Sequence, residues 1–168
     1  RTYKTLSRII KETDLKPAGH LTCVAATKAE VDAVIQEYHD IGVRHVVALR
    51  GDPQTGVGTA YEPHPEGYQS SIDLVAAIKK FGDMEVTVSA YPEKHPESVD
   101  WIADIDMLKR KVDAGADRAI TQFFFENDLF ERYLERVRRA GIYIPIVPGI
   151  ALVHNFTQVA NFAGKTGA

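Results

Sequence analysis

Short apolar runs alternate with longer segments of helical spacing along this chain. The apolar runs are nearly continuous, as expected of parallel strands that are buried on both faces. They predict strands at residues 20–25, 43–49, 85–91, 118–122 and 143–147.

The segments between these runs repeat apolar residues at the helical period. They predict helices at residues 3–13, 28–41, 69–81, 98–114, 127–140 and from 156 to Gly164. Thr27 and Glu30 have the spacing of a capping box at the start of the second helix. A glycine stops four of these helices, at Gly42, Gly82, Gly115 and Gly141.

Strands that alternate with helices predict an α/β fold with a parallel sheet, in a single domain over residues 1–168. A doubly wound five-stranded sheet would fit this length. A (β/α)8 TIM barrel needs about 250 residues, so the chain would be an incomplete segment of about five β/α units. Its first strand and last two strands would then lie outside the chain. The barrel is favoured because the helix at 3–13 has no strand before it.

Polar side chains at successive strand ends also favour the barrel, whose ligands bind at the carboxyl ends of the strands. Asp52 follows the second strand behind Arg50 and Gly51, and its carboxylate could stabilise a developing cation or steer a proton. The alternative is an ordinary turn aspartate before Pro53. Gln122 ends the fourth strand, where its amide must be hydrogen-bonded to the backbone or to a ligand.

Residues 91–97 follow the third strand and contain Tyr91, which could stack on a planar ring, and His95, which could donate to a phosphate or a ring carbonyl. The alternative is a loop that only caps the next helix. On that helix a stripe of polar side chains lies beside the buried face and could hold a ribose and a diphosphate, or could be a solvated surface. The stripe comprises Asp100, Asp104, Met107 and Lys111, with Arg110 beside it.

Two further segments have two interpretations each. The Gly- and Pro-rich loop at 52–67 is longer than most connections between a strand and a helix. One interpretation is a lid or binding loop, and the other is a tolerated insertion. The phenylalanines at 123–125 belong to the core more often than to a cofactor site.

Composition narrows the class of protein. Charged residues make up 26% of the 168 residues and the formal net charge is −3, which argues against nucleic acid as a partner. The single cysteine, Cys23, excludes an internal disulfide and fits a cytoplasmic protein. No run has the length of a membrane span. We find no dinucleotide-binding glycine motif, no nucleophile elbow and no metal-ligand spacing, so we expect no metal site.

Several ordered motifs resemble methylenetetrahydrofolate reductases. They are His20-Leu21-Thr22-Cys23, the run from Arg44 to Asp52, residues 91–97, the run from Leu108 to Ala116, Gln122-Phe123-Phe124-Phe125 and Pro148-Gly149-Ile150. The resemblance covers essentially the whole chain. It implies a (β/α)8 barrel that holds FAD, and a cytoplasmic homo-oligomer in one-carbon metabolism and methionine biosynthesis.

The resemblance also implies an oxidoreductase that reduces 5,10-methylenetetrahydrofolate to 5-methyltetrahydrofolate with NAD(P)H through FAD. Asp52 would be catalytic and would contact both flavin and folate. Substrate would contact Gln122, Gln158 and Phe162. The FAD contacts would be His20, Arg50, Gly51, Asp52, Ser70, Ser71, Tyr91, His95, Ser98, Asp104, Met107, Arg110 and Lys111.

Departures from the family pattern qualify this expectation. Ser70 and Ser71 stand where the family usually has a Tyr-Ala pair. The family's general acid, a glutamate on the first strand, would lie upstream of Arg1, so we expect this chain alone to be inactive. The alternatives are a non-catalytic flavin- or folate-binding module and a flavodoxin-like interaction domain.

Overall fold

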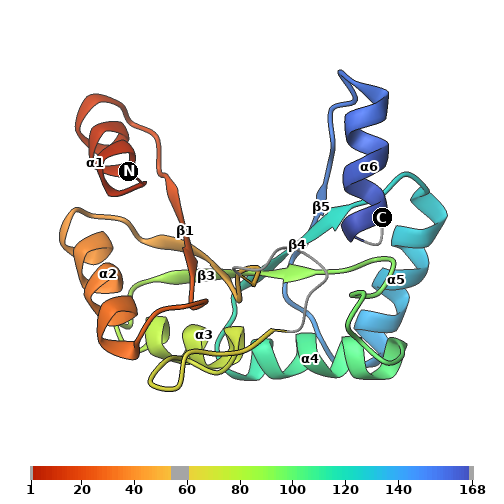
Figure 1. Ribbon diagram of the computed structural model, residues 1–168, viewed down its shortest axis with the longest axis horizontal. Helices are drawn as coiled ribbons and strands as arrows, with labels where there is room; N and C mark the ends of the chain where they lie inside the picture. The colour runs from red at the N-terminus through yellow and green to blue at the C-terminus, as the bar shows by residue number, and fades with distance from the viewer. Residues whose placement is uncertain (1, 54–60, 167–168) are drawn as a thin grey trace. The chain divides into compact units, whose positions relative to one another are not determined.

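The computed structural model describes residues 2–53 and 61–166, and Figure 1 labels its elements. Residues 54–60 of the predicted loop therefore lie outside the described part. The helices are α1 (Thr2–Glu12), α2 (Lys28–Asp40), α3 (Ser71–Lys79), α4 (Trp101–Asp113), α5 (Asn127–Arg139) and α6 (Phe156–Thr166). The strands are β1 (Ala18–Thr22), β2 (His45–Leu49), β3 (Glu85–Ala90), β4 (Arg118–Phe123) and β5 (Ile146–Gly149).

The strands form a parallel sheet in the order of the chain, β1-β2-β3-β4-β5. This sequential order, with a helix between consecutive strands, is that of an incomplete (β/α)8 barrel and confirms the predicted fold class. A doubly wound sheet would instead reverse its strand order at a switch point. The chain divides into two compact units, residues 1–88 with 114–117, and residues 89–113 with 118–168.

In the first unit, β2 and the start of β3 form the buried centre, while β1 alternates exposed and buried residues. Gly19 of β1 lies against Tyr38 of α2, since a Cβ at Gly19 would be 2.6 Å from the Tyr38 ring. The Tyr38 hydroxyl also donates to the His20 carbonyl at 3.2 Å. Strand β1 is thus held to α2 by close packing and by one hydrogen bond.

The predicted end of β1 at residue 25 is wrong. The strand ends at Thr22, and the chain turns through Val24 and Ala25. Ala25 has a φ of 54°, a left-handed conformation outside the range of an extended strand. The apolar run continues past the strand because Cys23, which is fully buried, belongs to the core without belonging to the sheet.

The predicted capping box is confirmed at the start of α2. Thr27 Oγ1 accepts from the Glu30 N–H at 3.2 Å, and Glu30 Oε2 accepts from the Thr27 N–H at 2.8 Å. Ser70 and Asp73 form a second capping box at the start of α3. Gly42 follows α2 with a φ of 92°, as the predicted helix stop requires.

The turn between α3 and β3 is held by the carboxylate of Asp83. Asp83 Oδ1 accepts from His39 Nε2 at 2.9 Å, and Asp83 Oδ2 pairs with Arg44 Nε at 2.7 Å. The His39 ring also packs against Phe81, with ring centroids 5.4 Å apart. These contacts join the end of α2, the start of β2 and the turn after α3.

We predict that this contact makes the stability of the fold sensitive to acid. Desolvation raises the pKa of Asp83, but the hydrogen bond from His39 and the positive charge of Arg44 outweigh it, so its pKa lies below the usual value. A lowered pKa in the folded state stabilises the fold at pH values above the unfolded pKa, and this stabilisation is lost as the pH falls through the folded pKa. Thermal unfolding of the wild type and Asp83→Asn across the acid range should therefore converge at low pH. A constant difference in Tm would contradict this role.

In the second unit, α4 and α5 supply several large side chains of the core. Tyr133, Val137 and Ile142 are fully buried, and Ile105 and Leu108 of α4 are also buried.

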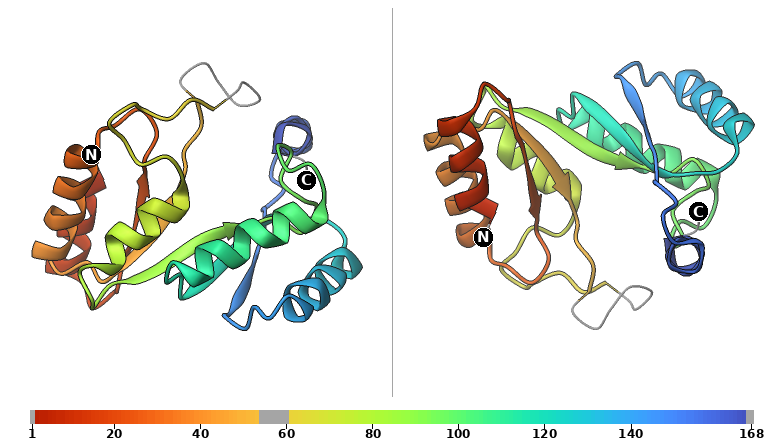
Figure 2. Two further views of the ribbon diagram at one scale, coloured as in Figure 1. Left: turned by 90° about the horizontal axis from the view of Figure 1, so that it is seen from below. Right: turned by 90° about the horizontal axis from the view of Figure 1, so that it is seen from above.

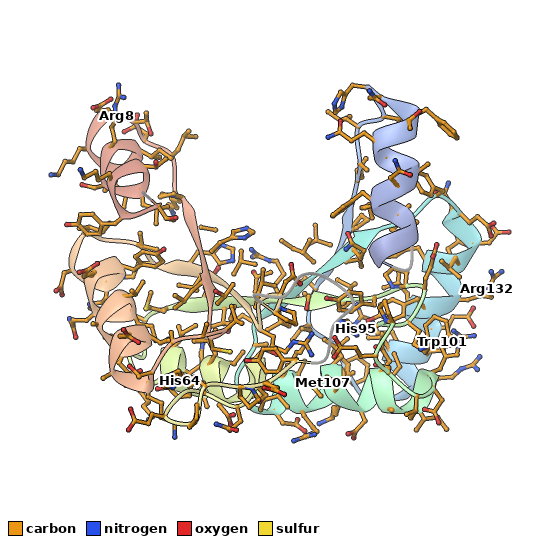
Figure 3. All side chains as sticks on the ribbon, viewed as in Figure 1. Arg8, His64, His95, Trp101, Met107 and Arg132 are labelled. Atoms are coloured by element: carbon orange, nitrogen blue, oxygen red, sulfur yellow. The ribbon has the colours of Figure 1, made fainter. Side chains whose placement is uncertain are left out.

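The start of α4 is fixed to α5 by Trp101, which Figure 3 labels between these helices. The Arg136 guanidinium lies 4.3 Å from the centroid of the Trp101 ring. This cation–π contact joins the two helices.

The predicted strand at 143–147 is displaced, because β5 begins at Ile146. The Arg138 guanidinium donates to the carbonyls of Ile142 at 2.7 Å and Ile144 at 3.1 Å, which holds this segment as the connection after α5. Tyr143 is consequently 77% exposed. In Figure 2 the chain passes through this connection from α5 to β5.

Candidate functional site

Arg50, Gly51 and Asp52 follow the carboxyl end of β2, as predicted, and Asp52 is exposed. Gly51 has a φ of 89°, and a Cβ there would lie 2.5 Å from Val24 Cγ1. Only glycine fits this position without strain, because both the conformation and the space exclude a side chain. The tight turn directs the chain so that the Asp52 carboxylate meets solvent at the end of the strand.

Arg50 is held by a residue that the sequence analysis did not single out, Tyr61. The Arg50 guanidinium lies 4.4 Å from the centroid of the Tyr61 ring, and the Cys23 thiol donates to the Arg50 carbonyl at 3.6 Å. Burial raises the pKa of the Cys23 thiol, and burial raises the pKa of Tyr61 to about 12. Both groups are therefore neutral at physiological pH, so Arg50 carries the positive charge of this cluster. The only feature of the sequence that could have indicated this contact is that Tyr61 is an aromatic residue in the long loop at 52–67.

The other predicted cofactor residues of the first unit have different surroundings. His20 is exposed on β1. Ser71 is buried, and the Ser70 hydroxyl accepts from the Asp73 N–H at 3.4 Å as the N-cap of α3. In this structure Ser70 acts as a helix cap, and its contact with a cofactor stays a prediction.

In the second unit, residues 91–98 form an ordered loop between β3 and α4. The edge of one ring faces the other in the pair Tyr91 and His95, whose centroids are 4.6 Å apart. Asp104 of α4 accepts from the His95 N–H at 3.0 Å and from the Ser98 hydroxyl at 2.8 Å through the same oxygen, Oδ1. The predicted residues Tyr91, His95, Ser98 and Asp104 therefore form one connected group, and Figure 3 labels His95 within it.

The polar stripe of α4 is divided between interior and surface. Asp104 and Lys111 are each 6% exposed, and Lys111 Nζ donates to the carbonyl of Ser89 at 3.2 Å. Met107 and Arg110 are exposed. The solvated-surface alternative is therefore wrong for Asp104 and Lys111, because a buried charge needs the protein partners that these two residues have.

A third group lies around the end of β4. Gln122 Oε1 accepts from the Phe123 N–H at 3.1 Å. Of the two partners expected for this amide, the backbone or a ligand, the structure shows the backbone. The rings of Phe123 and Phe162 are stacked with centroids 5.7 Å apart and an interplanar angle of 21°. Phe123 is buried and Phe162 is 51% exposed, so α6 places an aromatic face at the surface. Gln158 of α6 is also exposed.

The structure thus connects the predicted residues within local groups. Arg50, Gly51 and Asp52 form the group in the first unit. Tyr91, His95, Ser98 and Asp104 form one group in the second unit, and Phe123 with Phe162 forms another. That Asp52 meets Tyr91, His95 and Gln122 in one site stays a prediction.

The described residues lack two kinds of feature. Within 2–53 and 61–166, no three or more His, Cys, Asp or Glu side chains are placed to hold a metal ion. In the same ranges, no helix has the length and apolar character needed to cross a membrane.

Solved structures with a similar fold define the class of architecture. A phosphonopyruvate hydrolase superposes with a TM-score of 0.62 at 13% identity, covering 97% of this chain and 55% of that one. A 2,3-dimethylmalate lyase superposes with a TM-score of 0.56 at 12% identity, covering 99% of this chain and 65% of that one. These likenesses show that the chain has the parallel β/α fold of a TIM barrel.

The sequence comparisons give the family. The family profile "Methylenetetrahydrofolate reductase" matches residues 1–168. The 5,10-methylenetetrahydrofolate reductases of Salmonella typhimurium and Escherichia coli are each 46% identical over 166 residues, which is 99% of this chain. The Arabidopsis thaliana methylenetetrahydrofolate reductase (NADH) 1 is 34% identical over 97% of this chain and 29% of its own length. The chain belongs to the methylenetetrahydrofolate reductase family, and it spans 54% of the length of the two bacterial relatives.

Proposed function

We propose that the protein reduces 5,10-methylenetetrahydrofolate to 5-methyltetrahydrofolate with NAD(P)H and FAD, as a cytoplasmic homo-oligomer that supplies methyl groups for methionine synthesis. Family membership over the whole chain is the main support. The observation that carries the proposal is Asp52, an exposed carboxylate directly after the carboxyl end of β2 and behind a turn that only glycine fits.

The residues of the second unit fit FAD in their chemistry. An adenosine diphosphate needs a cationic group for its phosphates and an apolar surface for its adenine ring, and α4 offers Arg110 and Met107, both exposed. Asp104 and Lys111 are already bonded to protein groups, so we assign them the support of this surface. When bound, FAD supplies a carrier that takes a hydride from NAD(P)H and passes it to folate.

The residues of the chain would then have distinct tasks. Asp52 would stabilise the positive charge of the substrate's 5-iminium form, since a carboxylate fixed at that point favours a cation. Gln122 already uses its oxygen, so its NH₂ group would donate to the folate. Phe162 would present its exposed ring for stacking on the planar folate or nicotinamide.

The test begins with FAD binding by the full-length protein, measured by its visible absorption and by titration of flavin fluorescence. We expect Arg110→Gln to bind FAD about tenfold more weakly, because a charge-assisted contact to a phosphate is lost. Arg132→Gln is the matched control, since Arg132 is an exposed arginine of α5 outside the proposed site (Figure 3).

Three results would decide between the alternatives. FAD binding together with NADH oxidation and folate reduction would support the reductase. FAD binding without either reaction would favour a non-catalytic flavin-binding module. A colourless protein that takes up no FAD would contradict the proposal.

A further inference from the structure

The turn from Arg50 to Asp52 packs against the end of β1 and the residues after it. The ladder between β1 and β2 ends with Thr22 paired to Leu49. Just beyond this pair, a Cβ at Gly51 would lie 2.5 Å from Val24 Cγ1 and 3.0 Å from Thr22 Cβ. Packing as close as this leaves the turn little room to move.

Cys23 continues the contact between the two segments after the backbone ladder has ended. It lies outside the strand and is fully buried, and its thiol donates to the Arg50 carbonyl at 3.6 Å. A thiol is a weak donor, but burial shields this bond from competing water. The Arg50 carbonyl belongs to the same peptide plane as the Gly51 N–H, so the thiol fixes the orientation of the peptide that leads into the turn.

Tyr61 in turn orients this thiol. Its hydroxyl lies 4.0 Å from the Cys23 sulfur. Burial raises the pKa of both groups, so each keeps its proton at physiological pH. Because the single thiol proton is directed at the Arg50 carbonyl, the Tyr61 hydroxyl is the donor to the sulfur.

Tyr61 belongs to the part of the long loop that is fixed to α2 a few residues later. The Lys28 N–H donates to the Glu66 carbonyl at 2.9 Å, and the Tyr68 hydroxyl donates to Asp32 Oδ1 at 2.6 Å. These bonds hold the loop beside the start of α2. The position of Tyr61 is therefore supported by contacts that do not involve the turn at Gly51.

We propose that Cys23, oriented by Tyr61, is a positioning residue for the Asp52 carboxylate. It fixes the peptide between Arg50 and Gly51, and Gly51, with a φ of 89°, then turns the chain into Asp52. On the proposed function, on which this role rests, the carboxylate is held where the positive charge of the folate substrate develops. A group that is already in place stabilises such a charge without first having to reorganise.

The experiment compares the two half-reactions of the full-length protein by stopped-flow absorbance. Cys23→Ala removes the thiol, and we expect folate reduction to slow about tenfold, because displacing a catalytic group lowers the rate. Reduction of FAD by NADH should change by less than about twofold, since Asp52 has no charge to stabilise in that step. Cys23→Ser keeps a donor at this position and should restore most of the lost rate.

Two further variants separate positioning from a general loss of stability. In an Asp52→Asn background, Cys23→Ala should cause no further loss of folate reduction, because the carboxylate that Cys23 positions is already absent. Val43→Ala truncates a fully buried side chain before the other end of β2. It should lower the Tm but leave the ratio of the two rates unchanged.

Tyr61→Phe provides a milder form of the same test if Cys23→Ala does not fold. It removes only the hydroxyl that donates to the sulfur. We expect folate reduction to slow about threefold, the usual effect of losing one weak hydrogen bond, with FAD reduction unchanged.

Hydrogen–deuterium exchange of the segment 50–52 measures the turn without any cofactor. Exchange should be faster in Cys23→Ala than in Val43→Ala, and should return toward the wild-type rate in Cys23→Ser. Faster exchange in a protein that binds no FAD would support the hold on the turn and defeat the proposed function. Unchanged exchange, an equal loss in both half-reactions, or a loss that adds fully to that of Asp52→Asn would overturn the role of Cys23.

Discussion

Asp52→Asn is expected to slow the reduction of methylenetetrahydrofolate by about 10²- to 10³-fold, the usual effect of removing one group that stabilises charge in a transition state. NADH oxidation should fall much less, because only the folate reaction develops positive charge on its substrate. The carboxylate is exposed after β2 and the substitution keeps its shape, so the turn at Gly51 should be unaffected.

Stopped-flow measurement of the two half-reactions checks this difference, with FAD content determined for each protein. Asp14→Asn removes an exposed carboxylate between α1 and β1 and should change neither rate. An equal loss in both half-reactions would remove the role that we assign to Asp52.

Gly149→Ala is expected to lower the free energy of unfolding by roughly 3 kcal/mol, or to prevent folding of the second unit. A Cβ at Gly149 would lie 2.2 Å from the Thr121 carbonyl oxygen, and this neighbour is backbone that cannot rotate away. The Gly149 N–H also donates to Thr121 Oγ1 at 2.8 Å. The alanine would push β5 from β4 and break this bond.

Gly164→Ala is the matched control, since a Cβ there meets nothing within 4 Å. Alanine in helix α6 should raise stability by about 0.5–1 kcal/mol, because it restricts the unfolded chain. Denaturant unfolding of both variants measures the contrast. A Gly149→Ala protein as stable as the wild type would show that β5 can move without cost.

Much of the fold could be predicted because its signals are local. The capping box of Thr27 and Glu30 and the helix stop at Gly42 depend on a few neighbouring residues, and both are confirmed. The errors arose where distant contacts decide the structure. The end of β1 depends on the burial of Cys23 outside the sheet, and the start of β5 depends on Arg138 binding the carbonyls before it.

The candidate site shows the same limit. Strand ends predicted Asp52, Tyr91 and Gln122 as candidate site residues because a parallel sheet places such residues by topology. Helical spacing placed Asp104 and Lys111 beside the core, but it could not tell a bonded, buried charge from a solvated one. The contact of Tyr61 with Arg50 joins a loop residue to a strand end, and no spacing in the sequence encodes it.

The bonds from Asp104 to the loop before α4 have a consequence for association kinetics. The protein's own hydrogen bonds already order this loop. Binding of another molecule therefore costs little conformational entropy in the loop and requires no closing movement. Capture at this surface should therefore follow simple second-order kinetics, limited by encounter and orientation.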